Sequence, residues 1–195
     1  MNELIQIIKF LDEDKLQKIN NHLDTLEFSP NGLLGKEDNK VDTSVRSSLG
    51  VYLKKDHEVT KILHESMNNA LLEYRKRVIK ISDTFKYYPV PGGIGTTSWR
   101  ESIQVLQYSE NQKYNFHSDQ HVDKQAIEYH RAISIVLYLN DGFEGGGTEF
   151  PYATFKPKAG YGLIFPSNWC YPHSGQVVTK GIKRVAVTWY YVDIV

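Results

Sequence analysis

The chain has 195 residues, which is enough for one domain with a sizeable core and too few for two generous ones. Lysine and arginine together number 23, as do aspartate and glutamate, and no long basic run occurs, so the composition argues against a nucleic-acid partner. The longest apolar stretches, such as 133–139, are far shorter than a membrane-spanning helix, and Met1 begins no signal segment. We therefore expect a soluble, cytoplasmic protein with no membrane partner.

One cysteine, Cys170, excludes an internal disulfide and fits a reducing compartment. We expect Cys170 to be a small buried apolar group.

The first part of the chain, up to about residue 80, has the pattern of helices. Acidic residues 12–14 follow a short apolar run and begin a stripe of leucine and isoleucine at helical spacing, which ends at Leu26. A longer helix is predicted over 58–78, where six apolar residues recur with charges between them. Both stripes indicate packing against a sheet rather than partner surfaces.

The segment 82–100 is rich in tyrosine, proline and glycine and is long enough to suggest a function. We expect residues 85–99 to fold over a substrate as an aromatic lid. The alternative is a plain crossing between layers.

From about residue 101 onward the pattern changes to short runs of β-branched and aromatic residues separated by turn residues. The expected strands cover 103–108, 132–139, 154–156, 161–165 and 183–191. Such strands predict a sandwich or barrel with helices against one face. The whole chain, 1–195, is therefore expected to be one α+β domain, mainly β, with its barrel core at about 101–195.

A candidate metal site is formed by His117, Asp119 and His173. His117 and Asp119 stand two residues apart at the end of a predicted strand, where both side chains point the same way. His173 precedes the last strand and can join them within a barrel. Two imidazoles and one carboxylate leave three adjacent positions open on an octahedral ion, as in non-haem iron(II) oxygenases. Alone, the H-x-D pattern arises often by chance, and most such histidines are surface or core residues.

The assignment is strengthened by Lys183, ten residues after His173. The remote carboxylate of 2-oxoglutarate needs a buried cation opposite the metal. Lys183 and Arg184 are neighbours on a strand, so only one of them faces the barrel interior and the other faces solvent. The remaining histidines lack such a context and are expected to be solvated, without a ligand role; they are His22, His57, His64, His121 and His130.

Five segments, 45–53, 105–119, 131–140, 145–151 and 173–189, carry a family pattern over almost the whole chain. The second matches Y-x-x-G-x-x-Y-x-x-H-x-D except at Asn111, and asparagine tolerates the left-handed conformation expected of that glycine. The fourth matches G-G-x-T-x-F-P. Together the segments resemble the prolyl 4-hydroxylase type of iron(II)- and 2-oxoglutarate-dependent dioxygenase.

The resemblance implies that His117, Asp119 and His173 bind iron(II) and that Lys183 pairs with 2-oxoglutarate. The family places this cation six residues before a tryptophan, which selects Lys183 over Arg184. Contacts to the cosubstrate are implied for Tyr138, Tyr108 and Thr148. Contacts to the substrate are implied for Arg131 and Trp189. Each of these five also has a structural alternative, as a barrel aromatic, a turn cap, a structural arginine or a core tryptophan.

The implied fold is a double-stranded β-helix, or jelly-roll barrel, with N-terminal helices packed against one sheet. The implied reaction is hydroxylation with O2 and release of succinate and CO2, with peptidyl proline as the preferred substrate and ascorbate as an additional cofactor. Three alternatives stay open: a hydroxylase of a free amino acid or other small molecule, a barrel metal enzyme without 2-oxoglutarate such as a zinc hydrolase or isomerase, and a binding module with a vestigial site. Lys183 argues against the second and the complete triad against the third.

Overall fold

The computed structural model describes residues 2–30, 44–83, 100–120 and 131–191. It is mainly β, with a short 3-10 helix η1 (Asn2–Leu4) and two α-helices, α1 (Glu13–Leu23) and α2 (Glu58–Val78). No helix in these ranges has the length and apolar character needed to cross a bilayer. The lid expected at 85–99 lies outside the described residues.

The larger sheet has seven strands. They are β1 (Gln6–Lys9), β2 (Ser29–Pro30), β3 (Leu49–Tyr52), β4 (Gln104–Tyr108), β6 (Arg131–Tyr138), β10 (Tyr161–Pro166) and β13 (Lys183–Tyr191). Their order across the sheet is β1-β10-β6-β13-β4-β3-β2, and every neighbouring pair is antiparallel. The long strands β6 and β13 therefore occupy the middle of the sheet.

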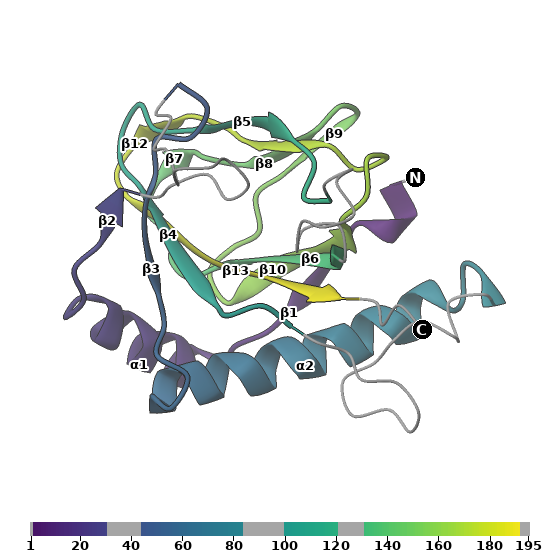
Figure 1. The fold of residues 1–195 in the computed structure, drawn as a ribbon, viewed down its shortest axis with the longest axis horizontal. Coiled ribbons are helices and arrows are strands. Elements are labelled where there is room, and N and C mark those ends of the chain that lie inside the picture. Colours follow the sequence, from purple (N-terminus) through teal and green to yellow (C-terminus); the bar gives the residue numbers. More distant parts are fainter. Residues whose placement is uncertain (1, 31–43, 84–99, 121–130, 192–195) are drawn as a thin grey trace.

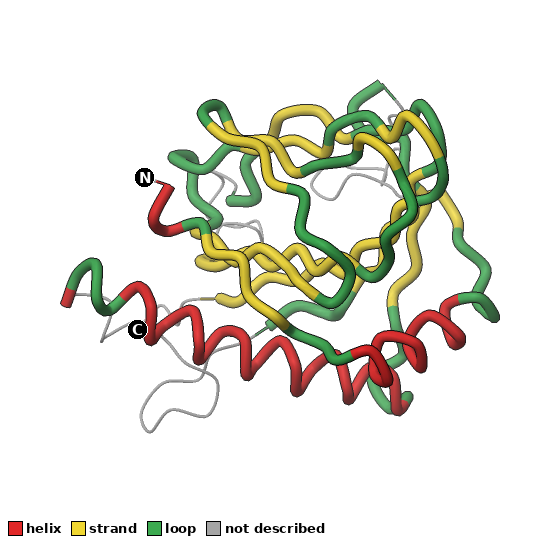
Figure 2. Tube along the Cα trace, turned by 180° about the vertical axis from the view of Figure 1, so that it is seen from behind, coloured by secondary structure: helices red, strands yellow, loops and turns green. Residues whose placement is uncertain are grey.

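A smaller sheet of four short strands faces the larger one (Figure 1). Its strands are β5 (Tyr114–His117), β8 (Thr148–Phe150), β9 (Ala153–Phe155) and β11 (His173–Gly175), in the order β5-β11-β8-β9. A ribbon of β7 (Glu144–Gly145) and β12 (Val178–Lys180) completes the strands. Both α-helices run along the outer face of the larger sheet, which Figure 2 shows from behind. The space between the two sheets is thus left for a site.

The helices form where the sequence provides caps and an apolar stripe. The Asp12 carboxylate accepts a hydrogen bond from the Lys15 backbone amide at 2.9 Å and begins α1. The His57 ring accepts one from the Val59 amide at 3.2 Å and begins α2. The buried stripe of α2, which includes Leu63, packs against the larger sheet in the main hydrophobic core.

The helix predicted over 58–78 is confirmed with the same ends, and the five predicted strands correspond to β4, β6, β9, β10 and β13 within one or two residues. Leu26 lies beyond the end of α1, yet it still packs against the main core. The apolar run before α1, to which no element was assigned, contains the edge strand β1. Cys170 is half-buried, so the expectation of a fully buried thiol was wrong; it packs at the edge of a small cluster around Phe150 and Phe165.

Candidate metal centre

Strand pairing brings His117 and His173 together. His117 ends β5, His173 begins β11, and the two residues lie directly opposite each other in the antiparallel pair. Their ring centroids are 4.4 Å apart. Asp119 follows β5 by two residues, and one ligand atom from each of the three residues lies within 4.8 Å of the others. The structure therefore groups the three residues that the sequence analysis selected.

Both imidazole rings are fixed by backbone carbonyls. Nδ1 of His117 lies 2.9 Å from the carbonyl oxygen of Asn115, and Nδ1 of His173 lies 3.2 Å from that of Tyr171. Since a carbonyl oxygen only accepts, each Nδ1 donates a hydrogen bond to it, and Nε2 is the nitrogen that either ring can offer to a metal. These Nε2 atoms lie 3.4 Å and 3.6 Å from the Asp119 carboxylate oxygens. The rings are thus oriented as metal-binding histidines are when a second group holds the other nitrogen.

The Asp119 carboxylate is buried and ionised. Its Oδ2 accepts a hydrogen bond from Ser134 Oγ at 2.6 Å, and that hydroxyl lies 2.8 Å from Ser167 Oγ. Burial alone would raise the pKa of Asp119, but His173, His117 and Ser134 outweigh it and hold the pKa well below its usual range. Burial lowers the pKa of His173 to about 4, which keeps the ring neutral at neutral pH. A carboxylate beside neutral imidazole is the protonation state that a divalent metal requires.

A buried ion pair supports the backbone at Asp119. Arg131 binds Glu101 through two contacts, Nε to Oε1 at 2.5 Å and Nη2 to Oε2 at 2.7 Å. Its Nη1 donates to the Asp119 carbonyl oxygen at 3.3 Å, and its guanidinium lies 3.7 Å from the centre of the Trp189 ring. Two guanidinium nitrogens are therefore committed to Glu101. The substrate contacts implied for Arg131 and Trp189 stay a prediction.

The four residues implied in cosubstrate binding form one buried cluster. Lys183 pairs with Tyr108 in the register of β13 and β4. Its Nζ lies 5.1 Å from the ring centre of Tyr108 and 5.1 Å from that of Tyr138. The Tyr138 hydroxyl lies 2.9 Å from Thr148 Oγ1, which joins β6 to the smaller sheet. The cluster therefore spans the space between the two sheets.

Lys183 is a buried cation that has no counter-ion in the part of the chain that the structure describes. Its exposure is 3%, and no carboxylate of the described residues forms an ion pair with it. Burial, together with nearby Lys156, lowers its pKa to about 7. Gly146 gives the side chain room, because a Cβ at this position would lie 3.1 Å from Lys183 Cδ. An unpaired buried charge is costly, so the site is suited to an anion.

Tyr114 connects the metal centre to this cluster. Its ring stacks on His117 at 3.7 Å and packs against the hydrophobic cluster that contains Tyr108 and Tyr138. An alternating strand would place Tyr114 and His117 on opposite faces, but the register of β5 and β11 shifts between these residues. The sequence analysis noted Tyr114 only as a motif residue, because a bulge of this kind leaves no pattern in the sequence.

The other polar expectations had mixed outcomes. Arg184 follows Lys183 on β13 and, as alternation requires, lies on the other face of the sheet, where it is partly rather than fully exposed. Its side chain is 19% exposed and forms an ion pair with Asp24 at 2.6 Å. His22 and His57 stack on each other at 3.7 Å. His121 and His130 lie outside the described residues.

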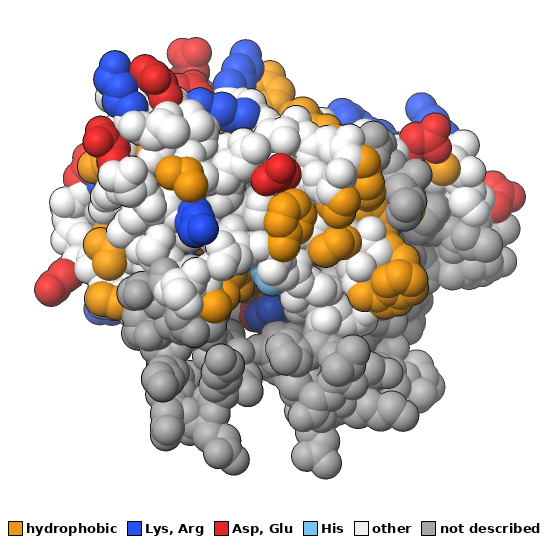
Figure 3. Space-filling model, turned by 90° about the horizontal axis from the view of Figure 1, so that it is seen from above, with side chains coloured by type: hydrophobic (Ala, Val, Ile, Leu, Met, Phe, Trp, Pro, Cys, Tyr) orange, Lys and Arg blue, Asp and Glu red, His pale blue; other side chains and the backbone are white. Residues whose placement is uncertain are grey.

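Hydrophobic side chains gather on the face seen in Figure 3, where a histidine is visible beside a hollow. The exposed large hydrophobic residues of the protein include Phe116, which neighbours His117, and Trp169, which is 78% exposed and precedes β11. Solvent-exposed aromatic rings of this kind are typical of peptide-binding surfaces.

Residues 103–192 match the family model described as the 2OG-Fe(II) oxygenase superfamily. The chain is 39% identical over 107 residues to a candidate prolyl 4-hydroxylase of Acanthamoeba polyphaga mimivirus and 32% identical over 126 residues to prolyl 4-hydroxylase 2 of Arabidopsis thaliana. The matches cover 46% and 48% of this chain and 44% and 42% of the two relatives. The chain thus spans less than half the length of these relatives.

Two solved structures share the fold over 97% of this chain. One is the viral collagen prolyl hydroxylase of Paramecium Bursaria Chlorella virus-1 in its 2OG complex, with a TM-score of 0.67, 20% identity and 97% of that chain covered. The other is a prolyl hydroxylase of Trichoplax adhaerens bound to a hypoxia inducible factor peptide fragment, with a TM-score of 0.69, 18% identity and 84% covered. At these identities the likeness concerns the fold.

Proposed function

Because residues 103–192 match the family model of the 2OG-Fe(II) oxygenase superfamily, we propose that this chain is an iron(II)- and 2-oxoglutarate-dependent dioxygenase that hydroxylates peptidyl proline. The observation that carries the proposal is the grouping of His117, Asp119 and His173, joined through Tyr114 to a buried cluster in which Lys183 has no ion-pair partner among the described residues. With it we propose a single domain over 1–195, with helices up to about residue 80, whose facing sheets form a double-stranded β-helix.

Iron(II) fits the donor set of the triad. The Nε2 atoms of His117 and His173 and the carboxylate of Asp119 would hold it on one face, which leaves room for further ligands. Bound iron(II) supplies O2 activation coupled to decarboxylation of 2-oxoglutarate. Ser134 orients the carboxylate, and the Glu101–Arg131 pair fixes the backbone that carries it.

Lys183 would pair with the remote carboxylate of 2-oxoglutarate. Its Nζ lies 5.1 Å from the ring centres of Tyr108 and Tyr138, and the hydroxyls of Tyr138 and Thr148, which bond to each other, would offer further hydrogen bonds to the same ligand. The surrounding buried cluster, which includes Leu106 and Val185, excludes water and strengthens this ion pair.

Peptidyl proline is supported by two features. The relatives over the matched region are prolyl hydroxylases, and two exposed aromatic residues stand close in sequence to the proposed iron ligands, Phe116 directly before His117 and Trp169 four residues before His173. Proline-rich segments adopt an extended polyproline II helix that docks on aromatic surfaces with little loss of conformational entropy. A free amino acid is too small to use such surface aromatic side chains.

The test is turnover of proline peptides. The protein, supplied with iron(II), 2-oxoglutarate and O2, should form succinate and add one oxygen to a peptidyl proline, detected by mass spectrometry. Asp119→Ala should lose iron and lower succinate formation more than about a hundredfold, because a ligand is removed. Asp14→Ala on the exposed face of α1 is the matched control. Full iron content and turnover in Asp119→Ala would contradict the triad, and efficient hydroxylation of a free amino acid without peptide turnover would contradict the substrate.

A further inference from the structure

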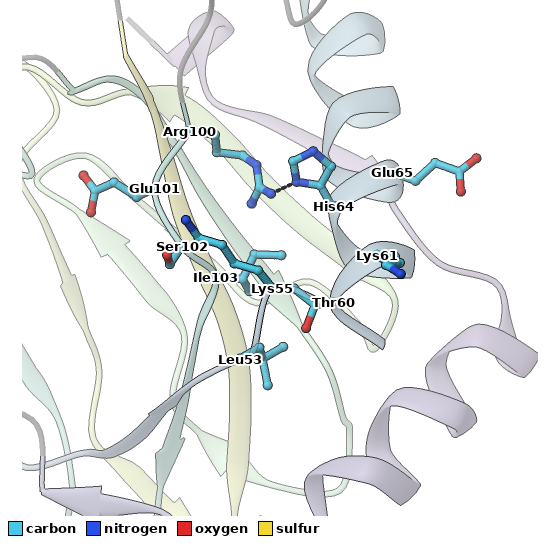
Figure 4. A pocket seen from close by; sticks show the side chains of 10 residues that line it. All are labelled: Leu53, Lys55, Thr60, Lys61, His64, Glu65, Arg100, Glu101, Ser102 and Ile103. Carbon is cyan, nitrogen blue, oxygen red and sulfur yellow. Dashed lines mark hydrogen bonds between the residues drawn. The ribbon is translucent and has the colours of Figure 1, made fainter. Parts of the chain in front are cut away.

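A pocket of about 440 Å³ lies between the first half of α2 and the segment that leads into β4 (Figure 4). It is separate from the metal triad. Its wall is formed by Lys55, which precedes α2, by Lys61 and His64 on α2, and by the segment 100–103. Leu53 closes one side of the pocket. The lining is thus apolar in part, with several groups that can be positively charged.

Cations predominate inside this pocket. In Figure 4 the side chains of Lys55 and Arg100 reach into the space between α2 and the segment 100–103. The Glu65 carboxylate points away from this space, and Glu101 points to the other side of its segment. The charge of Glu101 is neutralised by its ion pair with Arg131. The two acidic lining residues therefore leave the positive charge of the pocket largely uncompensated.

Arg100 meets only neutral groups among the described residues. Its Nη1 lies 3.4 Å from Thr188 Oγ1 and 3.8 Å from Met67 Sδ, and its Nη2 contacts the His64 ring. Its Nε is buried and has no hydrogen-bond partner in the described part of the chain. No carboxylate in those ranges forms an ion pair with it. A guanidinium in this situation is favourably completed by a carboxylate, which accepts two of its hydrogen bonds.

We propose that this pocket binds a carboxylate group, carried by an acidic residue that flanks the target residue of a peptide substrate. The peptide source rests on the proposed function. The position of the pocket supports it, because Glu101 lines the pocket and also holds Arg131, which donates to the Asp119 carbonyl oxygen. Glu101 thus links the pocket, through Arg131, to the backbone of a proposed iron ligand.

The same carboxylate chemistry is available from a free small anion, and the experiment separates the two sources. Proline peptides are made in pairs that differ only by Glu or Gln at one position, scanned on both sides of the proline. Their affinity for the anaerobic enzyme with iron(II) and 2-oxoglutarate is measured by calorimetry, without turnover. At the favoured position we expect the Glu peptide to bind about tenfold more tightly than the Gln peptide, less so as salt increases.

Variants test the assignment to this pocket. Lys55→Gln and Arg100→Gln should each lower the Glu-to-Gln affinity ratio towards one. Lys55 is exposed, so its substitution keeps the test valid should Arg100→Gln fail to fold. Lys76→Gln, an equal charge change on an exposed part of α2 outside the pocket, should keep the ratio near ten.

The outcomes are distinguishable. If no position shows a preference for Glu, or if the preference survives both pocket variants, the carboxylate bound in this pocket does not come from the peptide substrate. In a second measurement, N-acetylglutamate amide is titrated while the His64 ring is followed by NMR. A shift that Lys55→Gln abolishes supports the carboxylate site even where no peptide binds, which separates failure of the proposed function from failure of the pocket. Absence of both effects overturns the proposal.

Discussion

Replacing Lys183 by methionine should stabilise the protein in the absence of 2-oxoglutarate while it abolishes binding of that ligand. Lys183 is 3% exposed and has no ion-pair partner among the described residues. Methionine keeps most of the unbranched stem and removes the charge. When a residue serves ligand binding rather than folding, its replacement is expected to raise the stability of the protein and to weaken ligand binding.

The size of the effect follows from the pKa. Burial and Lys156 lower the pKa of Lys183 from 10.5 to about 7. The folded protein therefore binds this proton less tightly than the unfolded chain does, so the free energy of unfolding rises as the pH increases from about 7 to 10.5. The fall in the pKa from 10.5 to about 7 means that the charged form of Lys183 lowers the free energy of unfolding by at most about 5 kcal/mol below pH 7. Replacing buried charges by apolar groups typically stabilises by about 1–4 kcal/mol, and we expect a gain in that range.

The assay is urea unfolding at pH 7 and pH 10, with Lys180→Met as the control. Lys180 has a side chain 71% exposed and pairs with Glu144 at the surface, so its replacement should change the free energy of unfolding by less than about 1 kcal/mol. The gain in Lys183→Met should nearly vanish at pH 10. Anaerobic titration of 2-oxoglutarate into the iron(II) enzyme should show at least about tenfold weaker binding. A Lys183→Met protein that is less stable than wild type at both pH values would refute the claim that the charge of Lys183 destabilises the folded protein.

Two further predictions concern Ser134 and His22. Ser134→Ala removes the 2.6 Å hydrogen bond to Asp119 and should weaken iron(II) binding by about tenfold or more, measured by calorimetry, whereas unchanged affinity would argue against an orienting role. Burial and the stacked His57 lower the pKa of His22, so the folded state favours the neutral ring and loses stability as the pH falls through 6.5. His22→Asn should therefore lose less stability than wild type between pH 7.5 and pH 5.5 in urea unfolding. The same pH dependence in both proteins would count against this coupling.

The long elements were predictable because local pattern and global packing agree. In α2 the apolar residues recur at helical spacing and charges fill the exposed face, so both ends were predicted correctly. In β6 and β13 a run of β-branched and aromatic residues is long enough to exclude other structure. These elements bury their side chains in the main hydrophobic core and in a second cluster, and the apolar positions in the sequence mark this burial.

Of the short strands of the smaller sheet only β9 was among the predicted strand ranges, and β5, β8 and β11 were not. Strands β5 and β11 have only four and three residues, which is too short for an alternating pattern to identify them. Their pairing places His117 opposite His173, but register is a long-range property. For the same reason the sequence analysis selected the three triad residues but did not predict the hydrogen bond from Ser134 to Asp119 or the ion pair between Glu101 and Arg131.

Two buried cations near the metal centre differ in how their charge is balanced. Arg131 is 6% exposed, but Glu101 neutralises it, so its charge is satisfied within the fold. Lys183 is 3% exposed and forms no ion pair in the described ranges, although a hydrophobic residue of similar size would spare the protein the cost of removing a charge from water. Under the proposed function, the remote carboxylate of 2-oxoglutarate balances the charge of Lys183 as Glu101 balances that of Arg131.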